Sequence, residues 1–302
     1  MKKIVLLDGG LGQEIFHRAR QPAHPLWSAK VMMDQPEIVK DVHLDFIQAG
    51  AKVITVNSYT CTPTRLERDG RPEWFENLQK QALELAHAAR QESGTDASRV
   101  QIAGCLPPLI GSYTDNHRPF EQIKDEYRQI AEIQAPEVDI FIIETISNIK
   151  EAKAATEVAL ETGRPVMLSF TLSDTQPDTL RSGESLEDAL EAVSAYPLNA
   201  LLFNCSFPEI ISRGLDGIKH LDIPYGGYAN GFTSVKPLRP GGTVEALAAR
   251  EDLDEVTFTQ HAIDWIRKGA TIVGGCCEVS PAYISHLHRK LQEKGYRVTA
   301  LQ

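Results

Sequence analysis

Short, β-branched apolar runs alternate with longer amphipathic stretches along the whole chain, and this alternation limits its fold more than any other feature. The apolar runs are nearly continuous, which is typical of strands buried on both faces of a parallel sheet. We therefore expect eight strands, at residues 4–7, 53–56, 101–104, 140–143, 166–170, 200–203, 224–228 and 271–274. Helical spacing of apolar residues between them predicts eight helices, at residues 36–48, 74–91, 120–133, 148–162, 185–193, 208–220, 257–268 and 281–294.

Strict alternation of strands and helices predicts either a (β/α)8 TIM barrel or a doubly wound sheet. Two junctions, at Gly50 and Gly269, have the helix–glycine–strand order expected where a helix turns into the next strand. A length of 302 residues suits one barrel, and no linker, charge run or change of composition divides the chain. We therefore expect a single α/β barrel domain over residues 1–302.

Polar, glycine or cysteine residues follow seven of the eight expected strands. In a barrel these positions meet at the carboxyl ends of the strands, where active sites are built. The segments are Asp8-Gly9-Gly10, Asn57-Ser58-Tyr59, Cys105-Leu106-Pro107-Pro108, Glu144-Thr145, Asn204-Cys205-Ser206, Ala229-Asn230-Gly231 and Gly275-Cys276-Cys277-Glu278. Their convergence favours an enzyme.

The overall charge excludes some partners. A net charge of −10 and a pI near 5.4 argue against a nucleic-acid surface, which needs clustered Lys and Arg. The apolar run behind Lys2 and Lys3 stops at Asp8, which is too short for a signal peptide, and no stretch reaches the length of a membrane span. We expect a cytoplasmic protein; the sequence leaves its oligomeric state open.

Three of the five cysteines follow strands whose ends should meet. Cys205 follows the sixth expected strand, and Cys276 and Cys277 follow the eighth. Three thiolates on one rim can bind Zn2+ and leave the fourth tetrahedral position open, as in catalytic zinc sites. We expect Gly274 and Gly275 to let the backbone turn so that two successive side chains reach one ion.

The other two cysteines, Cys61 and Cys105, are expected to be small buried apolar residues. A disulfide between Cys276 and Cys277 is not expected, because a disulfide between neighbours is strained. A sulfur-rich shell suits a zinc ion that holds a substrate thiolate better than one that splits water. The sequence therefore predicts a catalytic zinc that ionises a substrate thiol.

These residues resemble the homocysteine S-methyltransferase family. Three segments match its hallmarks in order: Asp8-Gly9-Gly10, Asn204-Cys205 and Gly274-Gly275-Cys276-Cys277. The segments Leu26-Trp27-Ser28-Ala29-Lys30 and Val39…His43-Leu44-Asp45-Phe46…Ala49-Gly50-Ala51 are similar to the branch that uses S-methylmethionine. The resemblance covers about residues 4–294.

The resemblance implies a zinc-bearing barrel that transfers a methyl group to L-homocysteine and gives methionine. Cys205, Cys276 and Cys277 match the family's zinc ligands, and Asp8 and Glu144 match the acids that hold the substrate's ammonium group. Carboxylates at strand ends suit that role through charge-assisted hydrogen bonds. On the residues alone, Asp8 is equally well a turn residue. The alternative for Glu144 is a solvated rim charge, but its place directly after the apolar run 140–143 favours burial and a functional role. The catalytic group implied is the zinc-bound substrate thiolate itself.

The methyl donor is open, because the chain departs from the S-methylmethionine branch. Glu278 stands where that branch usually has Arg, directly after the cysteine pair, and the loop at 105–108 is atypical. S-methylmethionine, S-adenosylmethionine, dimethylsulfoniopropionate and betaine all remain candidates. Aromatic faces can hold such cations, which makes Trp27, Tyr59 and Tyr113 candidates alongside ordinary packing roles. Asn230 is either a contact for a substrate carboxylate or a turn residue.

Three other functions fit parts of the pattern. The chain could be the homocysteine-activating module of a cobalamin-dependent methionine synthase system, which would need partner modules. It could instead be a non-catalytic zinc or thiol sensor, or a barrel enzyme whose cysteines are structural. Activity of the isolated protein with an onium donor, metal content and single Cys→Ser changes separate these alternatives.

Overall fold

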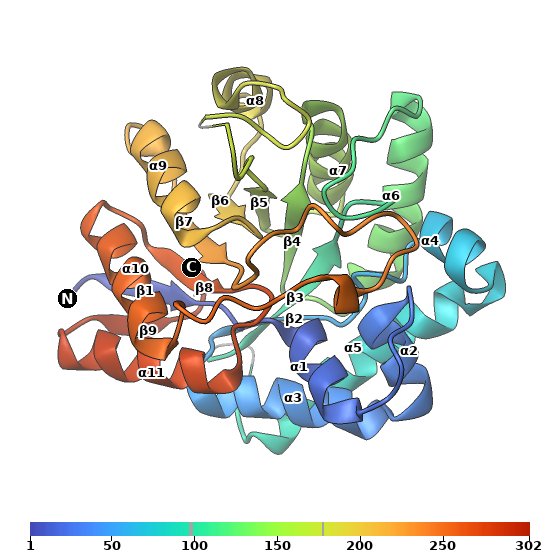
Figure 1. Cartoon of the computed structure of the whole chain (residues 1–302), viewed down its shortest axis with the longest axis horizontal. Coiled ribbons are helices and arrows are strands. Elements are labelled where there is room, and N and C mark those ends of the chain that lie inside the picture. Colours follow the sequence, from blue (N-terminus) through green and yellow to red (C-terminus); the bar gives the residue numbers. More distant parts are fainter. Residues whose placement is uncertain (97–98, 177) are drawn as a thin grey trace.

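A curled sheet of nine parallel strands forms the centre of the molecule, and helices cover its outer face (Figure 1). The computed structural model describes residues 1–96, 99–176 and 178–302, which form a single α/β domain. The strand order is β2-β3-β4-β5-β6-β7-β8-β1-β9. The strands are β1 (Lys3–Leu6), β2 (Val53–Thr55), β3 (Gln101–Leu106), β4 (Ile140–Ile146), β5 (Val166–Phe170), β6 (Ala200–Asn204), β7 (Tyr225–Ala229), β8 (Ile272–Gly275) and β9 (Arg297–Thr299).

The two ends of this sheet meet. Leu7, just after β1, forms a parallel bridge with Val53 of β2. Asp8 N donates to Val53 O at 3.0 Å, and Lys52 N donates to Leu6 O at 2.7 Å. The short strand β9 is added on the other side of β1, where Ile4 pairs with Val298.

All eight predicted helices are present, within a few residues of the expected limits. They are α3 (Pro36–Ala49), α5 (Phe75–Glu92), α6 (Phe120–Gln134), α7 (Ile149–Glu161), α8 (Leu186–Val193), α9 (Pro208–Ile218), α10 (Glu255–Arg267) and α11 (Pro281–Glu293). Strict alternation is nevertheless wrong, because further elements lie in the connections and at the end of the chain. They are α1 (Leu11–Ala19), α2 (Trp27–Asp34), α4 (Pro63–Asp69), the 3₁₀ turns η1 (Pro72–Trp74) and η2 (Val244–Ala246), and β9.

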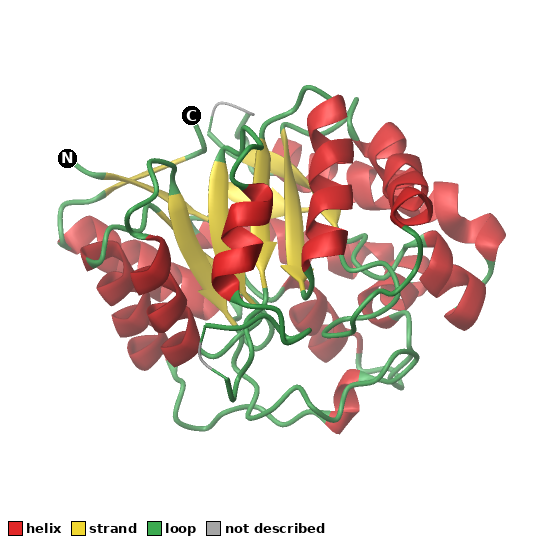
Figure 2. Ribbon diagram, turned by 90° about the horizontal axis from the view of Figure 1, so that it is seen from above, coloured by secondary structure: helices red, strands yellow, loops and turns green. Residues whose placement is uncertain are grey.

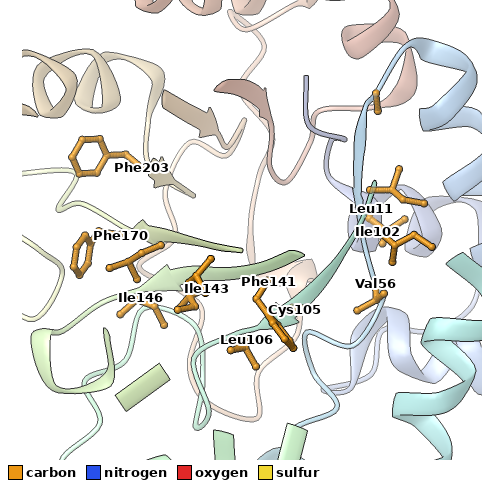
Figure 3. Close-up of a cluster of buried hydrophobic side chains, with 14 of the residues drawn as sticks. Leu11, Val56, Ile102, Cys105, Leu106, Phe141, Ile143, Ile146, Phe170 and Phe203 are labelled. Atoms are coloured by element: carbon orange, nitrogen blue, oxygen red, sulfur yellow. The ribbon is translucent and has the colours of Figure 1, made fainter. Parts of the chain in front are cut away.

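Side chains on the two faces of the sheet form separate apolar clusters. Every strand from β1 to β8 contributes to an inner cluster, which includes Val5, Val53, Ile142, Leu202 and Ile272. The outward-facing residues, with those of the helices, form the larger core, part of which is drawn in Figure 3. Successive residues of a strand point to opposite faces of the sheet, and here both faces are covered by apolar side chains. The strands are therefore continuous apolar runs in the sequence.

Both predicted helix–glycine–strand junctions are confirmed. Gly50 and Gly269 both have φ of 112°, as the helix–glycine–strand turn requires. Ser185 caps α8 by accepting a hydrogen bond from Asp188 N at 3.0 Å. Ser280 occupies the N-cap position of α11 and is followed by a first-turn proline, although its side chain makes no capping hydrogen bond.

Long loops gather at the carboxyl ends of the strands (Figure 2). The longest, residues 233–250 after β7, is called the strap here; it crosses in front of the sheet as the orange segment of Figure 1. Its base is closed by hydrogen bonds from Thr233 N to Ala248 O (2.8 Å) and from Arg250 N to Gly231 O (2.7 Å). Within the described ranges, no helix is long and apolar enough to cross a membrane.

Candidate active site

A pocket lies at the carboxyl ends of the strands. Residues at the ends of β1, β2, β4, β6, β7 and β8 line it, together with the first turns of α1 and α2 and much of the strap. Pro240 of the strap packs near Gly111 of the β3–α6 loop, where an added Cβ would lie 3.2 Å from its Cγ. The strap therefore covers the side of the pocket that lies opposite the strand ends.

The three predicted zinc ligands come together in this pocket. The Sγ atoms of Cys205, Cys276 and Cys277 all lie within 4.8 Å of one another, and all three residues line the cavity. In this structure Cys205 and Cys276 are joined by a disulfide, and Cys277 is free. The sequence does not anticipate this pairing, which follows from the convergence of β6 and β8 on one rim.

Buried polar groups hold Cys205 in a left-handed backbone conformation, with φ of 46°. Its carbonyl accepts hydrogen bonds from Thr171 Oγ1 (3.2 Å) and from Arg181 Nη2 (3.0 Å). Arg181 is itself fixed by a nearly buried two-pronged ion pair with Asp174, at 2.9 and 3.0 Å. This network fixes the position of the first cysteine.

The glycines before the cysteine pair serve a different purpose from the one expected. Neither Gly274 nor Gly275 has a positive φ, so conformational freedom is not what they supply. A Cβ at Gly275 would lie 2.1 Å from Val279 Cγ1, and one at Gly274 would lie 2.5 Å from Leu7 Cβ. They are required for close packing, whereas Glu278 takes the left-handed turn, with φ of 66°.

Two carboxyl groups without an ion-pair partner among the described residues face the same cavity. Asp8 Oδ2 accepts a hydrogen bond from Thr55 N at 2.8 Å, and Glu144 Oε1 accepts one from Cys105 Sγ at 3.0 Å. Burial raises the pKa of Asp8 to about 8, and the neighbouring Glu144 adds to the rise. Burial likewise raises the pKa of Glu144 to about 7. Both carboxyl groups line the cavity, and carboxylates are the groups that pair with cations through charge-assisted hydrogen bonds.

Asn204, directly before the first cysteine, connects β6 to the end of β4. Its Oδ1 accepts hydrogen bonds from Thr145 N (2.9 Å) and Ser169 Oγ (2.8 Å), and its Nδ2 donates to Thr145 Oγ1 (2.8 Å). Thr145 has φ of 61°, a conformation that is unfavourable for a β-branched residue. Asn204 therefore stabilises the turn that carries Glu144.

The predicted aromatic residues also line the pocket. The rings of Trp27 and Tyr59 meet edge to face, with centroids 6.5 Å apart, and Tyr59 Oη lies 2.9 Å from Ser112 Oγ. Tyr113 lies under the Arg181 guanidinium, 4.7 Å from its ring centroid. Tyr59 is likewise stacked under a protein cation, with the Arg65 Cζ 5.0 Å from its ring centroid, so two of the three rings already contact an arginine.

Asn230, the other predicted substrate contact, lies outside the pocket lining. It is fully buried, is not among the described residues that line the pocket, and accepts a hydrogen bond from Phe232 N at 3.2 Å, in keeping with a turn role. Its Nδ2 has no partner within the described ranges, and its contact with a substrate carboxylate stays a prediction.

Cys61 and Cys105 are buried and free, as expected, although Cys105 also contacts Glu144.

Several residues of the site carry no clear signal in the sequence. Arg65 lines the pocket from α4, a helix that was not predicted, and Arg181 lies in an irregular loop. The strap lies between the strand expected at 224–228 and the helix expected at 257–268, where the sequence predicts no element. The Thr62-Pro63 pair, an N-cap residue followed by a first-turn proline, could have revealed α4, since Thr62 Oγ1 accepts from Arg65 N.

Comparison with known proteins identifies the family of the chain. The profile of the homocysteine S-methyltransferase family matches residues 5–291. The homocysteine S-methyltransferase of Escherichia coli (strain K12) is 29% identical over 94% of both chains. Homocysteine S-methyltransferase 2 of Zea mays is 27% identical, over 96% of this chain and 90% of that protein. A selenocysteine Se-methyltransferase of Brassica oleracea var. italica is 27% identical, over 95% and 88% of the two chains.

Solved structures give the same result. The metallated form of the homocysteine methyltransferase MmuM from Escherichia coli superposes with a TM-score of 0.79 at 28% identity, over 95% of this chain and 96% of that one. Its oxidized form gives a TM-score of 0.78 at 29% identity, with the same coverage. The chain is thus an enzyme of the methyltransferase class. It belongs to the homocysteine S-methyltransferase family.

Proposed function

We propose that this enzyme transfers a methyl group from an onium donor to the thiol of L-homocysteine, with Zn2+ held by Cys205, Cys276 and Cys277. The observation that carries the proposal is the convergence of three sulfur atoms and two unpaired carboxyl groups in one pocket. The sulfur cluster suits a thiol ligand and the carboxyl pair suits an ammonium group, and homocysteine has both. Membership of the family supports the same assignment.

We further propose that the sheet is a closed (β/α)8 barrel that comprises residues 1–302. The bridge between Leu7 and Val53 and the inner cluster shared by eight strands support closure. In a closed barrel the ends of β6 and β8 are brought to one rim, as the cysteine cluster requires.

The donor set fits zinc. Tetrahedral thiolate sites have Zn–S distances of about 2.3 Å, which sets their sulfur atoms roughly 3.8 Å apart, within the limit observed here. Bound there, Zn2+ would supply a Lewis acid that lowers the pKa of a thiol at the open fourth position. Cys205 and Cys276 can serve as thiolates only after their disulfide is reduced.

The protein's own groups would then orient the reactants. Asp8 and Glu144 would hold the homocysteine ammonium, and its presence would return both carboxyls to the charged form. The homocysteine thiol releases its proton to solvent water, and the thiolate attacks the donor's methyl carbon. A new S–C bond forms as the bond from that carbon to the onium atom breaks, and the donor leaves as a neutral thioether or amine. The main work of the site is therefore positioning.

The test uses reduced, zinc-loaded protein with homocysteine and four separate donors: S-methylmethionine, S-adenosylmethionine, dimethylsulfoniopropionate and betaine. We expect methionine from at least one donor without cobalamin, and about one zinc per chain. Methyl transfer that requires added cobalamin or partner proteins would instead assign the chain to a methionine synthase system. Zinc binding without transfer from any donor would favour a sensor.

A further inference from the structure

One guanidinium group in the pocket is buried without an acidic partner. Arg65 of α4 is 5% exposed, and it lines the cavity. Its Nη2 donates to Pro108 O at 2.8 Å, and its Cζ lies 5.0 Å from the centroid of the Tyr59 ring. Its Nε has no hydrogen-bond partner among the described residues, and none of their carboxylates forms an ion pair with it.

Other largely buried arginines of this chain are paired. Arg90 lies 2.7 Å from Asp139, Arg118 lies 2.6 Å from Glu126, and Arg181 is held by Asp174. A buried charge without a counter-ion is strongly unfavourable, and natural proteins normally pair it. Because Arg65 faces the cavity, its missing partner is best supplied by a bound anion.

The surroundings of Arg65 define what else that ligand carries. Tyr59 lies between the guanidinium and Trp27, whose ring it meets edge to face. The indole Nε1 of Trp27 is also buried without a partner in the described part of the chain. Aromatic faces attract sulfonium and quaternary ammonium groups, whereas a guanidinium and an indole N–H attract a carboxylate. The group fits a zwitterion that has an onium centre and a carboxylate.

We propose that Arg65 binds the carboxylate of the methyl donor, so that the enzyme selects onium donors that carry a carboxylate. This inference rests on the proposed function, which assigns the cysteines and the Asp8–Glu144 pair to homocysteine. Arg65 repels a donor that has only a positive charge, and it attracts one whose carboxylate offsets that charge. The residue thus acts on donor choice and not on the activation of the thiol.

The experiment compares donors with and without the carboxylate charge in one protein. S-methylmethionine and dimethylsulfoniopropionate are each tested against their methyl esters, with kcat/KM measured at saturating homocysteine. In the unaltered enzyme we expect the free acid to be favoured. In Arg65→Gln the ratio of acid to ester should fall roughly 10–100-fold. The ratio is independent of the folded fraction, so loss of stability does not mimic the effect.

Two further variants separate charge from packing. Arg65→Lys, which keeps the charge, should retain part of the preference, and Arg90→Gln, which breaks a part-buried ion pair outside the pocket, should leave the ratio unchanged. The KM for homocysteine should stay constant in Arg65→Gln. The proposal is overturned if acid and ester lose activity equally, if the KM for homocysteine rises instead, or if trimethylsulfonium is as good a donor as the zwitterions.

The anion site at Arg65 can be tested separately from the proposed methyl transfer. If no donor yields methionine, calorimetric titration of the same acids and esters still tests Arg65, because binding needs no turnover. Tighter binding of the acid that is lost in Arg65→Gln would support the anion site, and equal binding of acid and ester would contradict it.

Discussion

The inner and outer regions of the pocket are built on different principles. The inner region comprises Asp8, Glu144 and the three cysteines, all at or just after the carboxyl ends of strands. The outer region comprises Trp27, Arg65 and the strap, which belong to helices and loops inserted between strands and the main helices. The inner region carries carboxyl groups and sulfur, whereas the outer region carries a guanidinium and aromatic rings.

On the proposed function, the inner region binds homocysteine and the outer region binds the methyl donor. Groups at strand ends are rigidly placed by the sheet, which suits the activation of a thiol. Groups on inserted helices can change without disturbing the sheet, which suits the choice of a donor.

The largest effect is expected from the inner sulfur cluster. Cys277→Ser should lower both zinc content and methyl transfer at least about 100-fold, because one of three ligands is lost. Metal analysis and a methionine assay measure this. Cys61→Ala is the matched control, since Cys61 is a buried free cysteine outside the described lining of the pocket. Full zinc content and turnover in Cys277→Ser would refute the role of the cluster.

The inner carboxyl pair should act on one substrate only. Glu144→Gln should raise the KM for homocysteine roughly 10–100-fold, since a hydrogen bond to a charged group contributes about 1.5–3 kcal/mol. The KM for the donor should change little. Steady-state kinetics with each substrate varied in turn measure this. An effect on the donor alone would reverse the assignment of the two regions.

Acid sensitivity should arise partly outside both regions, at His43 of α3. This residue is fully buried, neither ring nitrogen has a partner in the described ranges, and burial lowers its pKa to about 4 from an ordinary 6.5. The unfolded chain therefore binds a proton that the folded one does not, and stability falls as pH drops from about 6.5 toward 4. Between pH 7 and 5 the loss is about 2 kcal/mol.

Replacing His43 by Leu should remove this part of the acid sensitivity. Urea unfolding at pH 7 and pH 5, followed for both proteins, measures the difference. An equally steep loss of stability in His43→Leu would show that other groups, such as those of the pocket, control it.

The smallest effect is expected in the outer region. A Cβ at Gly12 of α1 would lie 2.6 Å from the Trp27 ring, so Gly12→Ala should displace the indole. We expect a several-fold higher KM for the donor, in line with a cation–π contribution of about 1 kcal/mol, and an unchanged KM for homocysteine. Gly217→Ala in α9, where the nearest atom would be 3.7 Å away, is the control. A donor KM unaffected by Gly12→Ala would remove Trp27 from the donor site.

The same division explains what could be predicted from the sequence. Asp8, Glu144 and the cysteines follow strands whose apolar runs are unmistakable, and the topology of a parallel sheet then brings them together. The sequence predicts the position of each strand within a few residues for the same reason. The family resemblance adds roles to residues that the pattern had already placed.

The outer region could not be predicted in this way. Arg65 belongs to a seven-residue helix without a strong period, and its burial depends on contacts with Pro108 and Tyr59 from other segments. The roles of Asn204 and Arg181 depend on hydrogen bonds across 59 and 24 residues of sequence, which no local pattern reveals. Similarly, the steric need for Gly275 appears only when Val279 is placed against it.

The central claim is that the three cysteines form a zinc site whose open position takes the sulfur of homocysteine. X-ray absorption at the zinc edge of the reduced, zinc-loaded protein tests it directly, because it counts sulfur ligands. We predict three sulfur ligands in the free enzyme and four after homocysteine is added, at about 2.3 Å. A sulfur count that does not rise with homocysteine, or a reduced protein that binds no zinc, would contradict the claim.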